Sequence, residues 1–251
     1  MTEAVVVDAT ERFVRAYMGR YDCSHDWYHV QRVVRQAVAI AADEAQRRPV
    51  DVLVVRLAAL LHDVDDAKYR QQGGGDRAFS SAEFLVAAGL DAARAALVAR
   101  IVDAVSFRKE LLADEQDRAG TTTTTAAGGA ADREWRQACA ELACVQDADR
   151  LDAIGAFGVL RCAAFSGARG RPLHDPEDAA LADITYDQYV ARSAGAGAGS
   201  AVSHFYEKLL RLAAMMKTDR GRAEARQRHA FMRGFLDQID AELRFGQSTA
   251  T

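Results

Sequence analysis

Residues 52–63, VLVVRLAALLHD, decide the fold. The stretch is apolar on nearly every side up to Leu61 and then ends in a His–Asp pair. A short apolar run of this kind is compatible with a buried strand or a buried helix, and periodicity alone does not separate them. Because Leu and Ala dominate its second half and its neighbours have helical patterns, we expect a buried central helix.

The segments around this stretch have the periodicity of amphipathic helices. In 26–47 the apolar residues recur at intervals of three and four, which places them on one helical face. Only 3 prolines occur, and 49% of the residues are hydrophobic, so a sizeable helical core can form. We expect an all-α fold, one domain over 1–251 with roughly nine helices, the last capped by Thr218. Further helices are expected at 3–19, 77–88, 91–106, 132–165, 201–216 and 219–243.

Stretches of small or repeated residues interrupt this pattern. AGTTTTTAAGGAA at 119–131 is low in complexity, and we expect a disordered surface insertion there. AGAGAGS at 194–200 and GGG at 73–75 are expected to be flexible loops. Neither is typical of a phosphate-binding loop, because GGGDR lacks the Lys–Ser/Thr of a P-loop and no predicted strand precedes AGAGAGS.

Composition argues against several classes of protein. The net charge of −4 disfavours a global electrostatic grip on nucleic acid, although local Arg and Lys can still hold a small anion. The N-terminus lacks the pattern of a signal peptide, and the longest apolar run is too short for a membrane span, so we expect a cytoplasmic protein. Four cysteines without zinc-ligand spacing are expected to be buried, reduced thiols; they are Cys23, Cys139, Cys144 and Cys162.

The pair His62-Asp63 needs partners, because unpaired charge at the end of a buried element is costly. A divalent cation is one such partner, and imidazole plus carboxylate suits Mn, Fe, Co, Ni or Zn. Two more candidates lie in helical segments with apolar neighbours, His29 upstream and Asp149 downstream. Three helices thus each offer side chains to one core site.

The order of these residues resembles the HD superfamily of metal-dependent phosphohydrolases. The motifs are DWYHVQRVV (26–34), RLAALLHDVDDAKY (56–69) and DADRLDAIGA (147–156). The C-terminal stretches SHFYEKLLRLAAMMKT and EARQRHAFMRGFLDQI match the family's usual ending, so the likeness covers roughly 10–243 apart from the Thr-rich insertion. It is strongest to small single-domain HD proteins of bacteria and fungi, which include a deoxynucleoside triphosphate pyrophosphohydrolase.

The resemblance implies an HD helical bundle with a buried site for one divalent metal ion, of Mn, Mg, Ni, Co, Fe or Zn. The implied ligands are His29, His62, Asp63 and Asp149. DAD at 147–149 also offers Asp147, and the family register A-D-x-L favours Asp149. Paired-metal HD proteins usually carry extra histidines near the His-Asp pair, and none follows Asp63 here, so one metal is expected.

The resemblance also implies a catalytic role for Asp63 and Asp66. A metal acidifies bound water and polarises a phosphoryl oxygen, and water then attacks phosphorus. Asp66 stands four residues after His62, where related enzymes place an acidic residue that helps to activate the water. The alternative is that Asp66 caps the following turn.

Candidate substrate-binding residues are Arg32, Lys68 and Lys208. Arg32 lies three residues after His29 on the same helical face, and its alternative role is a salt bridge. Lys68 and Lys208 could contact a phosphate or stay solvated. His204 and His229 are expected to be hydrogen-bonded structural residues, and the remaining basic residues considered, Arg169, Arg171, Lys217 and Arg228, are expected at the solvated surface.

The predicted activity is therefore hydrolysis of a small phosphorylated substrate, a nucleotide, with a (deoxy)nucleoside triphosphate pyrophosphohydrolase as the leading candidate. Two alternatives stay open: a phosphomonoesterase or phosphodiesterase of the same superfamily, and a catalytically silent HD module that senses a nucleotide. Neither nucleic acid nor a membrane is an expected partner, and a homodimer is compatible with the sequence.

Overall fold

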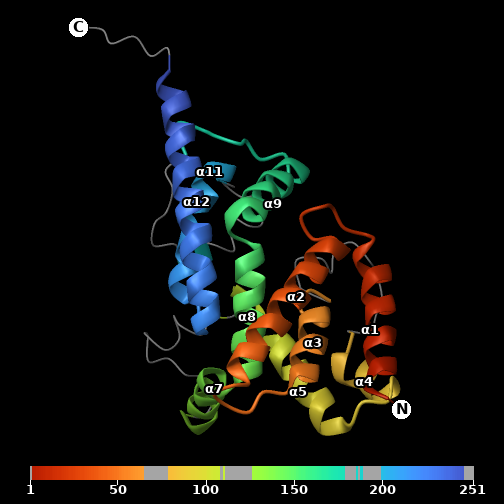
Figure 1. Cartoon of the computed structure of the whole chain (residues 1–251). Coiled ribbons are helices and arrows are strands. Elements are labelled where there is room, and N and C mark those ends of the chain that lie inside the picture. The colour runs from red at the N-terminus through yellow and green to blue at the C-terminus, as the bar shows by residue number, and fades with distance from the viewer. Residues whose placement is uncertain are drawn as a thin grey trace, which may run out of the picture.

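The computed structural model shows a helical chain in which α8 lies between two groups of helices (Figure 1). Among the described residues there are α-helices, one 3₁₀ helix and no strand, so the all-α prediction is confirmed. The structure describes residues 2–64, 79–107, 110, 126–178, 185, 187–188 and 199–245.

The first group of helices surrounds the predicted central helix. It consists of α1 (Glu3–Met18), α2 (Trp27–Glu44), α3 (Val52–Leu61), α4 (Ser81–Ala87) and α5 (Ala92–Val105). Helix α3 begins after Asp51, whose carboxylate accepts hydrogen bonds from the first backbone amides of the helix. From Val54 to Leu61 every residue except Arg56 is buried, and α3 packs against α1, α2, α5 and α8. The apolar run is therefore the buried helix that its composition predicts.

The second group packs around the long C-terminal helix α12 (Asp219–Arg244). It also contains α9 (Gly155–Ala168), α11 (Ala201–Glu207) and the 3₁₀ helix η2 (Leu209–Met215). Helix α8 (Ala140–Asp152) lies between the groups and is preceded by α7 (Ala126–Ala138), whose Asp132 pairs with Arg100 of α5. Thr218 caps α12 as predicted, because its hydroxyl accepts a hydrogen bond from the amide of Gly221. Helix α8 contacts α2, α3 and α5 on one side and α9 and α12 on the other, which joins the two groups.

The predicted helix over 132–165 is broken in two places, and one break shapes the site. Helices α8 and α9 meet at an angle of 70°. Gly155, the first residue of α9, has φ +75°, a left-handed conformation that residues with a side chain rarely adopt. A Cβ at Gly155 would also lie 3.0 Å from the side chain of Arg228. The bend thus depends on glycine and on close packing of α12.

Several other boundary predictions need correction. Residues 126–131 of the predicted disordered insertion form the start of α7, because their Ala-rich sequence favours helix over coil. Residues 119–125 and the GGG loop lie outside the described residues. Ser200, expected in a flexible loop, is buried and caps α11. The expected helix over 201–216 divides into α11 and the 3₁₀ helix η2.

The structure also bears on the predictions for the cysteines and for membrane-spanning segments. Cys139, Cys144 and Cys162 are buried and free, whereas Cys23 is free but exposed, which corrects the prediction for that residue. No single helix among the described residues is long and apolar enough to cross a membrane, and only the bent pair α8–α9 reaches that length and hydrophobicity together.

Candidate metal centre

Three helices position the predicted metal-binding residues. Helix α2 begins after Asp26, whose carboxylate accepts a hydrogen bond from the amide of His29 and so places His29 in the first turn. His62 and Asp63 follow α3 directly, and Asp149 lies in the last turn of α8. The contacts of α2 with α3 and α8 bring these turns together in the core.

The donor atoms of the four residues lie close together. His29 Nε2 is 3.2 Å from His62 Nε2. Asp63 Oδ2 is 3.3 Å from the first nitrogen and 3.4 Å from the second. Asp149 Oδ1 is 3.8 Å and 3.7 Å from the same two nitrogens. The ligand atoms of His29, His62 and Asp63 all lie within 4.8 Å of one another, so these three could hold a metal ion.

The hydrogen bonds of the two imidazoles fix which nitrogen faces the cluster. His62 Nδ1 is 2.8 Å from the carbonyl oxygen of Ala59, which can only accept, so Nδ1 carries a proton. His29 Nδ1 is 2.7 Å from Asp152 Oδ2 and donates in the same way. In the neutral rings both Nε2 atoms then present lone pairs to each other. Such an arrangement needs a positive species between them, either a proton or a metal ion.

The spacing of the donors fits a first-row divalent metal. Donors about 2.0–2.1 Å from a metal and about 90–110° apart are separated by about 3.0–3.4 Å. The two imidazoles and Asp63 satisfy this spacing, and Asp149 would reach it after moving inward by roughly half an ångström. The side chain of Asp149 is 33% exposed while that of Asp63 is 12% exposed. The cluster is therefore open to solvent on the Asp149 side.

Carboxylates control the charge of His62. Burial by itself lowers the pKa of this imidazole, but Asp63 and Asp149 raise it by more, to about 9. Because the pKa is raised in the folded protein, protonated His62 stabilises the metal-free fold. This stabilisation is complete below the ordinary pKa of 6.5 and is lost as the pH rises through about 9. At neutral pH a metal must therefore displace this proton.

We expect Mn²⁺ binding at pH 7 to release about one proton per metal ion, because His62 must lose its Nε2 proton to become a ligand. Calorimetric titrations in buffers with different ionisation enthalpies measure this number directly. Repeating them at pH 9 should give about half that number, since about half of the His62 imidazoles are then already neutral. Proton release that does not change between the two pH values would contradict the role of His62.

Asp152 is a residue of the site that sequence reasoning missed. Its carboxylate accepts hydrogen bonds from His29 Nδ1 and from Arg32 Nε, both at 2.7 Å. Arg161 Nη1 also approaches it, at 3.3 Å. Burial raises the pKa of Asp152, but these donors outweigh it and lower the pKa to about 2. A signal existed in the sequence, since a buried histidine needs a partner and Asp152 stands one helical turn after Asp149.

Replacing Asp152 by asparagine is expected to weaken Mn²⁺ binding about 10–100-fold without removing a ligand. The amide can still accept from His29, but it no longer holds that ring with a negative charge or balances the charges of Arg32 and Arg161. Metal titration of the chelator-treated protein provides the measurement. Asp240→Asn, on the exposed surface of α12, is the matched control and should bind as the unmodified chain does.

Arg32, one of the predicted substrate-binding residues, forms a salt bridge, which is the alternative role that the sequence left open. Its guanidinium makes a two-point ion pair with Asp152 and lies 4.2 Å above the ring of Phe157. Lys208 Nζ lies 5.1 Å from the ring centre of Phe107. Asp66 and Lys68 lie outside the described residues. The substrate roles of Arg32, Lys68 and Lys208 and the catalytic roles of Asp63 and Asp66 stay predictions.

Asp147 and Asp149 point to different places, although both come from DAD. The carboxylate of Asp147 accepts hydrogen bonds from the amides of Lys217 and Thr218 and from the hydroxyl of Thr218, at 2.7–3.0 Å. It therefore binds the segment that begins α12. Asp149 is the one of the two that lies beside the imidazoles.

Two further histidines have surroundings worth noting. His25 has its ring centre 5.9 Å from that of His29 and lies at the edge of the cluster. His229 was expected to be hydrogen-bonded, yet its buried Nδ1 has no partner among the described residues.

Comparison with known proteins agrees with the geometry. A family model described as HD domain matches residues 26–154, and the chain belongs to this family. Uncharacterized protein YpgQ of Bacillus subtilis (strain 168) is 31% identical over 246 residues, which are 97% of this chain and 96% of YpgQ. The HD assignment predicted from the three motifs is thereby confirmed.

Solved structures extend the similarity to the fold. A Lactobacillus plantarum protein is 32% identical with a TM-score of 0.73, over 97% of this chain and 98% of that one. YpgQ of Bacillus subtilis in complex with ADP is 29% identical with a TM-score of 0.65, over 99% and 100%. An HD-superfamily hydrolase of Bacillus thuringiensis is 26% identical with a TM-score of 0.62, over 97% and 100%. The chain thus carries a hydrolase-type HD domain.

Proposed function

We propose that this protein is a metal-dependent phosphohydrolase that cleaves a nucleotide, with a (deoxy)nucleoside triphosphate as substrate and pyrophosphate as product. The observation that carries this proposal is the meeting of two inward-facing imidazole nitrogens and two carboxylates from three helices. We also propose that one divalent ion, Mn²⁺ among the candidates, is bound there. A cytoplasmic location and a homodimer stay predictions.

The residues of the chain have distinct tasks in this proposal. A divalent ion in the site would acidify water and draw charge from a phosphoryl oxygen. His29 and His62 would bind it through Nε2, Asp63 and Asp149 through one oxygen each. Asp152 holds the ring of His29 in place, and Asp66 would accept the proton of the attacking water. The opening on the Asp149 side admits water and the phosphate chain of the substrate.

A nucleotide is the favoured substrate class for two reasons. The HD proteins that these motifs resemble include a nucleoside triphosphate pyrophosphohydrolase, and the related YpgQ has been crystallised in complex with ADP. The same complex is also compatible with the second candidate, a module that binds a nucleotide and does not turn it over. Binding alone therefore does not separate enzyme from sensor.

Product analysis separates the candidates. The purified protein is incubated with a panel of nucleotides, cyclic dinucleotides and phosphomonoesters, each with Mn²⁺, Mg²⁺, Co²⁺ or Ni²⁺. We expect pyrophosphate and a nucleoside monophosphate from a triphosphate, and loss of both products in Asp149→Asn. Release of inorganic phosphate or cleavage of a diester instead would support the alternative hydrolases. Tight nucleotide binding with no product under any metal would overturn the enzymatic proposal in favour of the sensor.

A further inference from the structure

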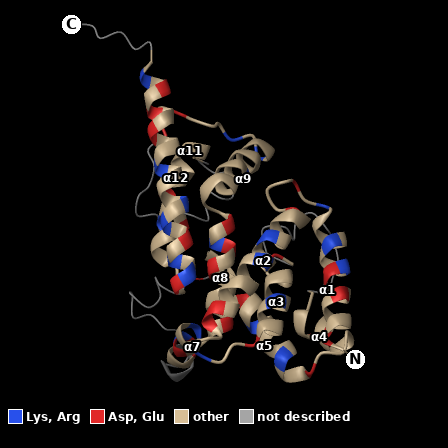
Figure 2. Ribbon diagram, in the orientation of Figure 1, with Lys and Arg blue, Asp and Glu red and all other residues tan. Residues whose placement is uncertain are grey.

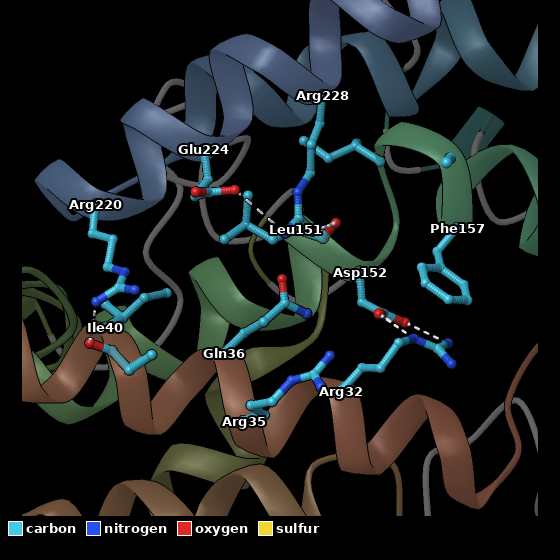
Figure 3. A pocket seen from close by; sticks show the side chains of 13 residues that line it. Arg32, Arg35, Gln36, Ile40, Leu151, Asp152, Phe157, Arg220, Glu224 and Arg228 are labelled. Atoms are coloured by element: carbon cyan, nitrogen blue, oxygen red, sulfur yellow. Dashed lines mark hydrogen bonds and ion pairs between the residues drawn. The ribbon is translucent and has the colours of Figure 1, made fainter.

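A cavity of about 590 Å³ lies between α2 and α12, beside the bend between α8 and α9. Figure 3 shows Arg32, Arg35 and Gln36 extending from α2, and Arg220 and Arg228 extending from α12. The size falls within the range of roughly 300–1,000 Å³ that is usual for small-molecule sites.

This cavity is separate from the metal centre. None of the four proposed metal ligands lines it. Asp152 is the residue common to both regions, because its carboxylate binds His29 on one side and Arg32, a lining residue, on the other. His29 itself is fully buried between them. A ligand in the cavity would therefore not touch the cluster of donor atoms.

The lining has the charge of an anion site. It contains four arginines and two carboxylates. Arg32 is paired with Asp152, Arg228 with Glu224 and Arg220 with Asp43, so among the described residues Arg35 supplies the unpaired positive charge. Figure 2 shows basic segments on α2 and along α12 among acidic ones. Guanidinium groups are the side chains best suited to bind phosphoryl oxygens at two points.

Several donors in the cavity are still available. Arg35 is exposed and has no ion pair or hydrogen bond among the described residues. Arg228 donates through Nη1 to the carbonyl of Leu151 at 2.6 Å, and its Nη2 lies 3.6 Å from the carboxylate of Glu224. Arg220 donates through Nη1 to the carbonyl of Ala39 and to the carboxylate of Asp43, both at 3.1 Å. Each guanidinium has five N–H donors, so further donors remain on both.

Gln36 adds an independent sign of a polar ligand. Its Oε1 atom is buried and accepts no hydrogen bond from the described residues. A buried amide without a partner is costly, and its oxygen and nitrogen can exchange places by rotation. Rotation of the amide would bring this oxygen to the cavity, where a polar ligand would supply the missing hydrogen bond. The neighbouring walls are apolar, formed by Ile40, Leu151, Ile154 and Phe157.

We propose that the cavity between α2 and α12 is a second binding site, distinct from the metal centre, for a small phosphorylated ligand. Arg35, Arg220 and Arg228 contact its phosphoryl oxygens, and Gln36 supplies a hydrogen bond. The recognised chemistry is the phosphoryl group, which a nucleotide or an inorganic phosphate can provide. This inference does not rest on the proposed hydrolase activity.

The test measures binding without any metal. The full chain is treated with chelator and titrated with ADP and, separately, with pyrophosphate. We expect at least one of the two to bind, and Arg35→Ala to weaken that binding by about tenfold, with a larger loss in Arg35→Glu. Binding by ADP and not by pyrophosphate identifies an organic phosphate ligand, whereas similar binding of both identifies recognition of the phosphoryl group alone.

Three further variants make the test specific. Arg226→Ala, an exposed position of α12 outside the lining, should bind as the unmodified chain does. His62→Ala should also retain chelator-resistant binding, since it alters only the metal centre. Gln36→Leu should weaken binding less than Arg35→Glu. Absence of binding for both probes up to millimolar concentration, or binding that His62→Ala removes and Arg35→Glu leaves intact, would overturn the proposal.

Discussion

Replacing His62 or Asp63 by alanine is expected to weaken Mn²⁺ binding more than about 100-fold and to reduce hydrolysis to background. Loss of a supporting residue typically costs 10–100-fold in metal affinity, and these changes remove a donor itself. His62 and Asp63 stand next to each other after α3 and both face the imidazole of His29. Metal analysis after dialysis, together with product formation from a triphosphate, measures both effects.

A matched control shows whether the effect is specific to His62 or follows from replacing any histidine of the chain. His174, in a different His-Asp pair, is exposed, so His174→Ala should retain the metal and the activity. Circular dichroism of each variant establishes that it is folded. Stoichiometric metal in both His62→Ala and Asp63→Ala would refute the metal centre, and with it the proposed function.

Asp147→Ala is expected to produce the largest loss of stability, about 3–5 kcal/mol. The buried carboxylate accepts three hydrogen bonds from Lys217 and Thr218, and alanine would leave these donors buried without a partner. Gly221 packs so closely against this carboxylate that a Cβ there would overlap it. For a chain of this length the melting temperature should fall by roughly 10 °C or more, as thermal unfolding followed by circular dichroism would measure.

Two controls show whether Asp147 is structural. Asp237→Ala, exposed on α12, should change the free energy of unfolding by less than about 0.5 kcal/mol. Asp149→Asn should show the opposite pattern to Asp147→Ala, with loss of metal binding and a smaller change in melting temperature. If Asp147→Ala instead lost the metal and kept its melting temperature, the two aspartates would have exchanged roles.

The sequence predicted those residues of the site that stand out within their own segment of the chain. His29 and Asp149 could be selected because a polar side chain in an apolar helical segment needs a partner, and the HD motifs supplied the order. The structure brings both beside His62 and Asp63. The choice of Asp149 over Asp147 came from the family register alone, since Asp147 and Asp149 both have apolar neighbours in the sequence.

Other features depend on contacts between distant segments and could not be read in this way. Asp152 meets His29 across 123 residues of chain, so its place one helical turn after Asp149 makes it a candidate, but its pairing with His29 follows only from the packing of α2 on α8. The bend at Gly155 depends on α12, whose Arg228 occupies the space that a side chain would need. The cavity between α2 and α12 has lining residues from three separate parts of the chain and no continuous motif.

Three aspartates of α8 serve three different neighbours: Asp147 binds the start of α12, Asp149 lies in the metal cluster and Asp152 supports His29. Each residue of an α-helix advances the direction of its side chains by about 100°. Deleting or inserting one residue between them would therefore rotate one carboxylate out of register with its neighbour. The spacing of the three aspartates thus couples the docking of the C-terminal helix to the arrangement of the core cluster, and a change in the length of α8 would disturb both at once.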